Sequence, residues 1–493
     1  MSIEIVKIKT ITDSRLLSIS NFRFSFLKQC LVSFIVLSCL LTVDCIPSFY
    51  QSGQAYAFSI KDEKEYGEKM LAVIRKEFNL IDELDILQYI VQISKKIVVT
   101  AGPQYFDYHF YVIDNREFNA FAAPSGLIFI HSGIIGAMKT EGELVSVIAH
   151  EIGHVMSRHI ADRIDKTKKV SAGTLAMVLA GILVGGGALS QALITGGLAT
   201  GEAMFLQFSR ENEEEADRIS FALMQDLNRD PQDMVSMLNT MHKVSRIRMG
   251  NIPQYLLTHP KPELRMGYVQ DLIYVHPRKN YAAFDQFDFK RVQLKIASLS
   301  EDLNKLKPKY NRDIRNAENE EDRILAQYGL SFIHLAEGEY SRAIEGLNTV
   351  NSFYSDKVNV WVDLGRAHLS NGDLAQASKF FEMARNKDPG NWYAAYYLAL
   401  TLEKKGEIDR AEQLYLQVQS HVPDYPDVYL QLARIAEDKR DTGLSHFYLG
   451  LSFFYDGNFS SSTFHFKKAK ELLKSKARLA EIDEKLSKIN ELK

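Results

Sequence analysis

The chain has 493 residues, more than one hydrophobic core usually supports, so two or three domains are expected. Its hydrophobic content of 46% and charged content of 25% are those of a soluble globular protein, and a formal net charge of -3 lacks the basic excess of nucleic-acid-binding proteins, so no nucleic-acid partner is predicted. All 3 cysteines (Cys30, Cys39 and Cys45) lie near the N-terminus. A zinc site of four cysteines is excluded by number, and a mixed cysteine and histidine site in the body of the chain is excluded by position.

The first 57 residues are predicted to be a signal peptide. Basic residues precede an apolar run at 30–43, and an Ala-x-Ala cleavage pattern ends at Ala57. Cleavage near Ala57 leaves a mature chain without cysteine, which suits an oxidising compartment such as the periplasm. An uncleaved membrane anchor and a lipid anchor on Cys45 stay open as alternatives.

The next segment predicts helices and then short strands. Two amphipathic helical stretches occupy 58–102, and the alternation of apolar and polar residues at 108–115 is typical of a strand. A turn at 124–126 precedes a second expected strand at 127–131. A strand that follows 118–120 is expected at a sheet edge, where it could bind an extended peptide as an added strand.

The most informative motif lies in a helical pattern at 142–164, where His150, Glu151 and His154 stand in the order H-E-x-x-H. Apolar residues recur there at spacings of three and four, as expected of a helix. Residues four apart lie on one helix face, so both histidines can direct a ring nitrogen at one metal ion. Glu151 falls beside them, where it can act as general base on a metal-bound water.

A catalytic zinc needs a third protein ligand besides two histidines. In a continuous helix His159 would lie on the opposite side from His150, so it is expected to be structural or exposed. The acidic run at 211–217 offers carboxylates from a second helix, on which Glu213 and Asp217, four residues apart, share a face. Glu213 can ligate zinc while Asp217 orients a ligand histidine. The remaining carboxylates are expected on a solvated face: Glu211, Glu214 and Glu215.

Between the two motifs lies an apolar, glycine-rich segment at 170–209, in which Glu202 is the only charge. It is long enough to cross a bilayer. A buried helical hairpin or a lid beside the active site is the preferred interpretation, and membrane contact or insertion through 170–209 is the alternative. The polar stretch at 276–322 is predicted to be a helical linker.

An internal repeat follows the linker. Small and large residues recur every 34 positions, as when Leu364, Gly372 and Ala377 are followed by Leu398, Gly406 and Ala411. This period and pattern are those of tetratricopeptide repeats, in which small residues let two helices approach closely. A later unit is out of phase by about half a repeat, which predicts an inserted helix near 428–437.

The motifs resemble a family of zinc peptidases. The segment Phe118–His159 is similar to the catalytic core of the family that includes the prenyl-protein peptidases and the HtpX membrane proteases, and Ser209–Asp217 is similar to its third-ligand motif. Leu257–Arg265 resembles the family's Thr-His-Pro segment. Together with the repeats and the export signal, the chain resembles the soluble periplasmic BepA-type branch.

The resemblance implies roles for named residues. Glu213 would complete the zinc site with His150 and His154, and Asp217 would orient a ligand histidine. His259 would be a regulatory or transition-state residue, either as a fourth ligand in a closed state or as a hydrogen-bond donor.

The predicted architecture is α+β and mainly α. A signal peptide (1–57) precedes a gluzincin-like zinc metalloprotease domain with a small sheet (58–275). The linker (276–322) then leads to an α-solenoid of tetratricopeptide repeats (323–475) and a C-terminal helix or tail (476–493).

The predicted function is that of a zinc-dependent endopeptidase in the cell envelope. The resemblance implies cleavage of unfolded, misassembled or stalled envelope proteins, a chaperone role in outer-membrane protein assembly, and contact with the assembly machinery through the repeats. Two alternatives stay open. One is a chaperone or adaptor that acts mainly through its repeats and has a latent protease site. The other is an integral membrane zinc protease that uses 30–43 and 170–209 as spans.

Overall fold

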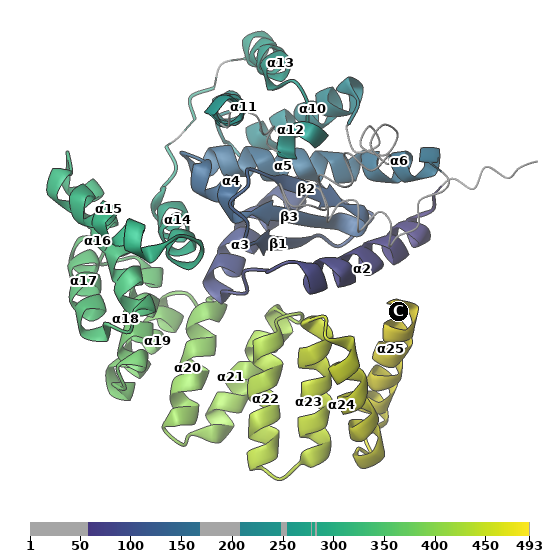
Figure 1. The fold of residues 1–493 in the computed structure, drawn as a ribbon, viewed down its shortest axis with the longest axis vertical. Helices are drawn as coiled ribbons and strands as arrows, with labels where there is room; N and C mark the ends of the chain where they lie inside the picture. Colours follow the sequence, from purple (N-terminus) through teal and green to yellow (C-terminus); the bar gives the residue numbers. More distant parts are fainter. Residues whose placement is uncertain (1–57, 168–207, 248–253, 278, 282, 493) are drawn as a thin grey trace, which may run out of the picture. The chain divides into compact units, whose positions relative to one another are not determined.

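The computed structural model describes residues 58–167, 208–247, 254–277, 279–281 and 283–492 (Figure 1). The predicted signal peptide and nearly all of the apolar segment at 170–209 lie outside these residues. The described part is mainly helical with one small sheet, as the sequence predicts. Within it, no helix combines the length and the apolar composition that a membrane crossing requires.

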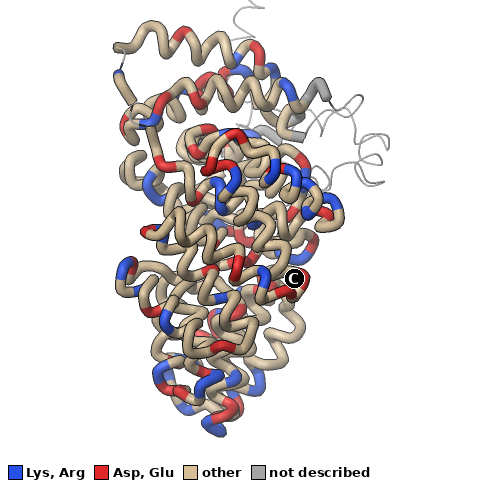
Figure 2. The backbone as a smooth tube through the Cα atoms, turned by 90° about the vertical axis from the view of Figure 1, so that its left-hand side faces the viewer, with Lys and Arg blue, Asp and Glu red and all other residues tan. Residues whose placement is uncertain are grey.

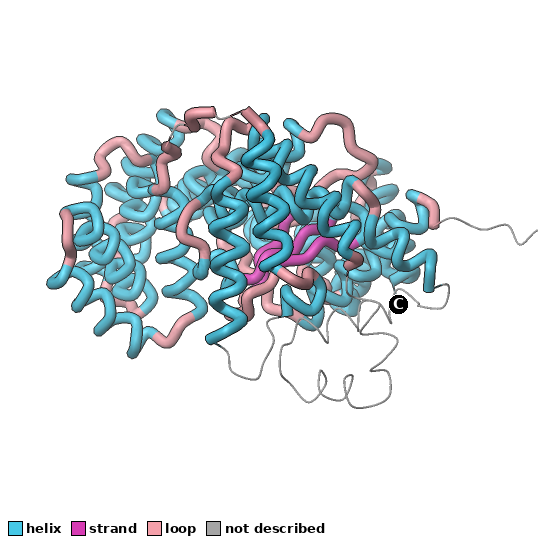
Figure 3. The backbone as a smooth tube through the Cα atoms, turned by 90° about the horizontal axis from the view of Figure 1, so that it is seen from above, coloured by secondary structure: helices cyan, strands magenta, loops and turns pink. Residues whose placement is uncertain are grey.

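The sheet has three strands in the order β1-β3-β2, namely β1 (His109–Ile113), β2 (Ala120–Ala123) and β3 (Leu127–His131). β1 runs parallel to β3, with His109 opposite Leu127, whereas β2 runs antiparallel to β3, with Ala120 opposite Ile130. Figure 3 shows the strands enclosed among helices. The strands expected at 108–115 and 127–131 are confirmed, and the strand expected after 118–120 lies at a sheet edge.

The two faces of the sheet pack against different helices, because successive strand residues point to opposite sides. One face packs against α2 (Ile60–Glu77) through Tyr111, Ile113, Phe121, Ala123, Leu127 and Phe129. The other face joins a larger core with α3 (Leu84–Thr100) and α5 (Glu141–Met156) through Phe110, Val112, Ala120, Ala122, Ile128 and Ile130.

Further helices complete this half of the chain. They are α4 (Ser132–Ala137), α6 (His159–Thr167), α10 (Arg210–Asp226), α11 (Gln232–Ile247), α12 (Gln254–Thr258) and α13 (Pro262–Val275). The segment predicted as a linker contains two helices, α14 (Phe287–Ser300) and α15 (Leu303–Asn316). α14 is more than a connection, since Phe289, Val292 and Ile296 belong to the same core as the sheet.

The C-terminal half consists of helical pairs. They run through α16 (Glu320–Ala336), α17 (Tyr340–Phe353), α18 (Val358–Ser370), α19 (Leu374–Lys387), α20 (Trp392–Lys404), α21 (Ile408–His421), α22 (Pro426–Asp438), α23 (Thr442–Tyr455), α24 (Phe459–Leu472) and α25 (Lys476–Leu492). Gly338, Gly372 and Gly406 end successive first helices with φ of 77°, 82° and 83°, a conformation that glycine adopts at low cost. Acidic and basic positions are intermixed along the helices (Figure 2).

Candidate metal centre

The helix that carries the histidines is held in the middle of the core. The Thr140 hydroxyl accepts a hydrogen bond from the backbone N–H of Glu143 and so caps the N-terminus of α5. All residues from Glu141 to Val155 are buried. His150 and His154 therefore project from a buried helix toward α10.

The second helix approaches closely because Gly153 has no side chain. A Cβ built at Gly153 would lie 3.1 Å from the Cα and the carbonyl oxygen of Ala216 on α10. α10 itself starts with a capping box between Ser209 and Asn212. Glu213 follows within the first turn, so the cap fixes the part of α10 that carries the carboxylate.

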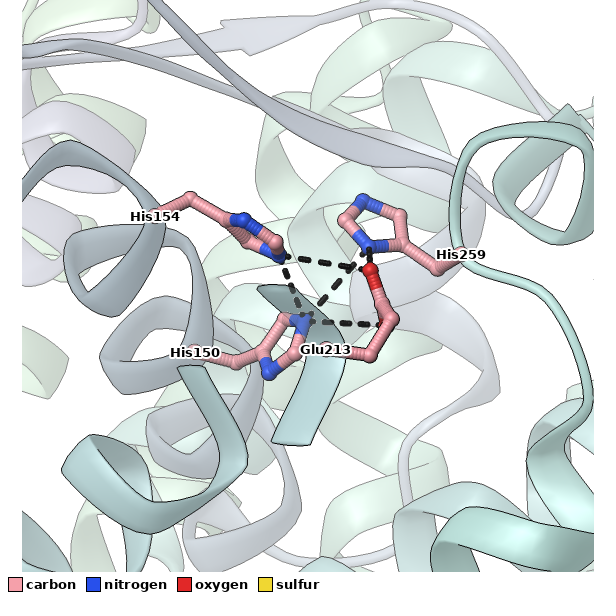
Figure 4. Close-up of side chains that lie close together, drawn as sticks. All are labelled: His150, His154, Glu213 and His259. Carbon is pink, nitrogen blue, oxygen red and sulfur yellow. Dashed lines mark hydrogen bonds and ion pairs between the residues drawn. The ribbon is translucent and has the colours of Figure 1, made fainter. Parts of the chain in front are cut away.

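Four side chains converge between these helices and the loop after α12: His150, His154, Glu213 and His259 (Figure 4). The Nε2 atoms of the first two histidines lie 3.1 Å apart. Glu213 places its carboxylate oxygens 3.6 Å and 3.5 Å from the Nε2 atoms of His150 and His154. His259 Nδ1 lies 3.4 Å from His150 Nε2 and 2.9 Å from the Glu213 carboxylate.

These distances fit a metal ion. With metal–ligand bonds of about 2.0–2.1 Å, the ligand atoms of a tetrahedral site stand about 3.4 Å from one another. The four groups are buried and match that spacing within about half an ångström. Two imidazole nitrogens, a carboxylate and a further imidazole are also a donor set that zinc accepts.

Neighbouring groups fix which ring nitrogens carry lone pairs. His150 Nδ1 lies 3.0 Å from Asp217 and donates to that carboxylate, which leaves Nε2 free to bind a metal. His154 Nδ1 lies 2.9 Å from Nδ1 of His159, whose Nε2 faces Glu215 at 3.3 Å. If Nε2 of His159 donates to Glu215, Nδ1 of the neutral His159 ring is an acceptor. Nδ1 of His154 is then the donor to His159, and Nε2 of His154 carries a lone pair that can bind a metal.

Arg265 on α13 supplies the positive charge that balances these acids. It forms two hydrogen bonds to Asp217, of 2.7 Å and 2.9 Å, and a 2.7 Å ion pair to Glu213. Burial alone would raise the pKa of Asp217, but Arg265 and the contact with His150 hold it at about 2. Burial opposes ionisation of Glu213 as well, yet Arg265 and His259 hold its pKa well below the usual range. Both carboxylates are therefore anionic.

Glu151 lies beside the four groups and is completely buried. Its carboxylate accepts a 2.9 Å hydrogen bond from the backbone N–H of Ala122 on β2 and a 3.2 Å bond from the hydroxyl of Tyr255. The same carboxylate lies 3.6 Å from Nε2 of His259. Glu151 thus joins the edge strand to the candidate metal centre.

Aromatic rings cover the remaining side. Phe208 stacks on His154 with ring centroids 3.9 Å apart, and Tyr255 lies 4.3 Å from the ring of His259. The backbone N–H of Phe208 donates a 3.0 Å hydrogen bond to the carbonyl of Thr258. The segment that precedes α10 and the loop that carries His259 are therefore tied together.

The structure brings together every residue that the sequence singled out for the site. Asp217 lies against His150, and Glu215 is exposed, but His159 is buried and contacts His154. The expectation that His159 faces away assumed one continuous helix. α5 instead ends at Met156, and the left-handed Arg158 (φ 51°) turns the chain before α6 begins.

The roles of Arg265, Tyr255 and Phe208 were not predicted from the sequence. A role for Arg265 could have been predicted, because this residue ends the segment that resembles the Thr-His-Pro motif. Nothing in the local pattern marks Tyr255 or Phe208, which meet the site only through the fold.

Comparison with known proteins agrees with this geometry. Residues 87–273 match the model of peptidase family M48, and residues 334–400 and 368–435 match a tetratricopeptide repeat model. The chain contains an M48 peptidase domain followed by tetratricopeptide repeats. The M48 domain holds all of the site residues described above, and its family implies a metal, so this part of the chain is a metallopeptidase-family domain.

Named relatives share this region. A beta-barrel assembly-enhancing protease of Yersinia pestis is 33% identical over 222 residues, 45% of this chain and 45% of that protein. The mitochondrial metalloendopeptidase OMA1 of Schizosaccharomyces pombe is 31% identical over 196 residues, 40% of this chain and 53% of that protein. The alignments therefore span about half the length of these relatives. Among solved structures, the crystal structure of MamA is 20% identical, and the match covers 42% of this chain and 99% of MamA with a TM-score of 0.26.

Proposed function

We propose that the protein is a zinc-dependent endopeptidase. The observation that carries the proposal is the convergence of His150, His154 and Glu213 at tetrahedral spacing with Glu151 next to them. Without a metal, the ring nitrogens and the carboxylate of this cluster would direct lone pairs at one another in a buried site, which is costly. The M48 match and the protease names of the relatives support the same activity.

The chemistry follows from the residue types. A bound zinc ion would lower the pKa of a coordinated water and polarise the scissile carbonyl. Glu151 accepts the proton of the attacking water and delivers it to the leaving amine. The hydrogen bonds from Ala122 and Tyr255 hold its carboxylate in place for both transfers.

The substrate would bind to β2 as an added strand. β2 pairs with β3 on one side, and no described strand pairs with its other side. Because Ala122 in this strand donates to Glu151, a peptide aligned with β2 passes directly beside the base. Binding through the backbone makes the enzyme select extended, unfolded chain more than particular side chains.

His259 would keep the resting site closed. Its Nδ1 occupies the fourth corner of the candidate tetrahedron, where water or substrate must bind during catalysis. Of the two roles that the sequence left open, this position favours the fourth-ligand role. Opening would require the loop after α12 to withdraw together with the segment at Phe208, because a backbone hydrogen bond joins them.

The setting that we propose is the periplasm, with misfolded or stalled envelope proteins as substrates and a chaperone role in outer-membrane protein assembly. The name of the Yersinia pestis relative, a beta-barrel assembly-enhancing protease, and the tetratricopeptide repeats, which are protein-binding modules, support this. The assembly machinery would contact the repeats.

Glu151→Gln tests the peptidase activity. The amide keeps the size of the carboxylate and can still accept the Ala122 hydrogen bond, so zinc content and melting temperature should match those of the wild type. Casein cleavage should fall by about 10²- to 10⁴-fold, the usual contribution of a general base. Glu211→Gln, an exposed carboxylate on α10, is the matched control and should cleave normally. Retained cleavage by Glu151→Gln would refute the assigned base.

A second candidate function, a chaperone with a latent site, is favoured by the position of His259. It predicts that wild-type protein loaded with zinc suppresses aggregation of an unfolded protein, does not cleave casein, and is unaffected by a chelator. Chelator-sensitive cleavage of casein would exclude it as the main activity.

A further inference from the structure

A cavity of about 370 Å³ lies where the peptidase half meets the repeats, away from the candidate metal centre. One side is formed by Arg75 on α2, Asp82 after it and Tyr111 on β1. The other side is formed by the turn before α22 and the end of α23, with Asp424 and Tyr455 among the lining residues. β1 is the sheet edge opposite to β2, so this cavity is a separate feature from the proposed peptide-binding edge.

The cavity carries more negative than positive charge. Three carboxylates line it, those of Asp82, Asp424 and Asp456, against the single guanidinium of Arg75. Arg75 contacts Asp424 at 3.4 Å, and Tyr111 donates a 3.3 Å hydrogen bond to the same carboxylate. Among the described residues, neither Asp82 nor Asp456 has an ion-pair partner, and both line the cavity while keeping part of their surface exposed to solvent. The cavity therefore contains two carboxylates, those of Asp82 and Asp456, that no described cation pairs with.

Partial removal from water disfavours ionisation of both acids. Partial desolvation raises the pKa of Asp82 to about 6, and the neighbouring carboxylates of Asp456 and Asp424 act in the same direction, against Arg75. Burial also raises the pKa of Asp456. A cation that entered the cavity would reverse both effects.

The aromatic walls indicate what kind of cation fits. The guanidinium of Arg75 already lies 5.6 Å from the ring centroid of Tyr111 and 5.9 Å from that of Tyr455, within the range of cation–π attraction. Phe78, Phe110 and Tyr425 add apolar surface to the same cavity. Within the part of the chain that the structure describes, the cavity's carboxylates are not part of a side-chain group that could hold a metal ion. A planar or elongated cation with an apolar stem suits these walls better than a metal does.

We propose that this cavity binds an arginine or lysine side chain of a protein that the repeats hold. The stem of such a side chain would lie against the aromatic walls, and its charge would reach Asp82 and Asp456. The position between peptidase and repeats suits a polypeptide that contacts both halves at once. The proposal does not depend on the peptidase activity, because binding here requires neither the metal nor Glu151.

The test measures binding without cleavage. Full-length protein with Glu151→Gln is titrated, in the presence of a chelator, into a fluorescein-labelled heptapeptide that has one central arginine between neutral residues. The comparison peptide carries citrulline, which has the same shape and no charge. Fluorescence polarisation should give about tenfold tighter binding for the arginine peptide, because the charge is recognised in a partly desolvated pocket. Equal binding of the two peptides would overturn the proposal without any protein variant.

Variants then locate the site. The double substitution Asp82→Asn with Asp456→Asn should remove most of the preference for arginine, and it should fold, because neither carboxylate has a described ion pair to lose. Asp438→Asn removes one exposed charge at the far end of α22 and should keep the preference. A preference that survives the double substitution places the binding elsewhere. Free agmatine should compete at least tenfold more weakly than the peptide, and equal competition would mean that the pocket takes small cations instead of a protein.

Discussion

Replacing Asp217 with asparagine tests how the protein prepares the metal site. Asp217 accepts hydrogen bonds from Nδ1 of His150 and from two nitrogens of Arg265. Its two oxygens thus face three donors. In Asp217→Asn one of those oxygens becomes an NH₂ group that points at a donor, whichever way the amide is turned. The variant loses either the bond that orients His150 or a bond to Arg265.

The expected magnitude follows from these contacts. Partners that orient a ligand histidine typically change metal affinity by about 10- to 100-fold, which corresponds to about 1.4–2.8 kcal/mol. Arg265 keeps its ion pair with Glu213 but loses one of its two buried anions. Removing one partner of a buried ion pair lowers the free energy of unfolding by about 3–5 kcal/mol. Because asparagine keeps one oxygen as an acceptor, we expect a loss at the lower end of this range, about 3 kcal/mol for the metal-free protein.

Zinc competition against a fluorescent chelator measures the first effect, and thermal unfolding followed by circular dichroism in the presence of a chelator measures the second. Asp226→Asn, an exposed carboxylate on the same helix, is the matched control and should change neither quantity. If Asp217→Asn bound zinc within twofold of the wild type, Asp217 would not hold His150 in its ligand orientation. The assignment of the three metal ligands would then lose its main electrostatic support.

Three further substitutions probe the site and its surroundings. Gly153→Ala should push α10 away from α5 by a few tenths of an ångström. It should weaken zinc binding in the same competition assay while the helical content stays unchanged. An unchanged zinc affinity would mean that the close contact with Ala216 is not needed. His259→Ala should speed casein cleavage and weaken zinc binding, since a fourth ligand is lost; slower cleavage would assign His259 to the chemical step instead. Asp363→Ala should lower the free energy of unfolding by about 3–5 kcal/mol in a denaturant titration, because Arg291 loses a buried partner. A loss below about 1 kcal/mol would show that Asp85 alone is a sufficient partner for Arg291.

Local patterns were enough to predict the helices that carry the site. The spacing of four places His150 and His154 on one face wherever the chain is helical, and the same argument selects the face shared by Glu213 and Asp217. The repeats are equally local, since each glycine turn recurs 34 residues later. What such patterns cannot give is the pairing of α5 with α10, which depends on the missing side chain of Gly153 and on the cap at Ser209.

The prediction for His159 was wrong in its geometry because a periodic pattern does not show a helix break. Arg158 takes a left-handed conformation that L-residues other than glycine seldom adopt. Its side chain explains why the conformation is tolerated, since it forms an ion pair with Glu63 and donates to the carbonyl of Phe58. Those contacts come from a segment about 100 residues away, so the turn that brings His159 to His154 is set by tertiary structure.

The polar segment at 276–322 illustrates the same limit at the junction of the two halves. Arg291 and Lys295 of α14 suggest a solvated helix in sequence, yet both are buried, where Arg291 pairs with Asp85 and Asp363 and Lys295 pairs with Asp85. Buried charges persist only where partners are supplied, and these partners come from α3 and α18. α3 also packs against α5 through the Tyr89 hydrogen bond to Glu141. The buried charges of α14 therefore connect α18 of the repeats, through α3, to the helix that carries both histidines.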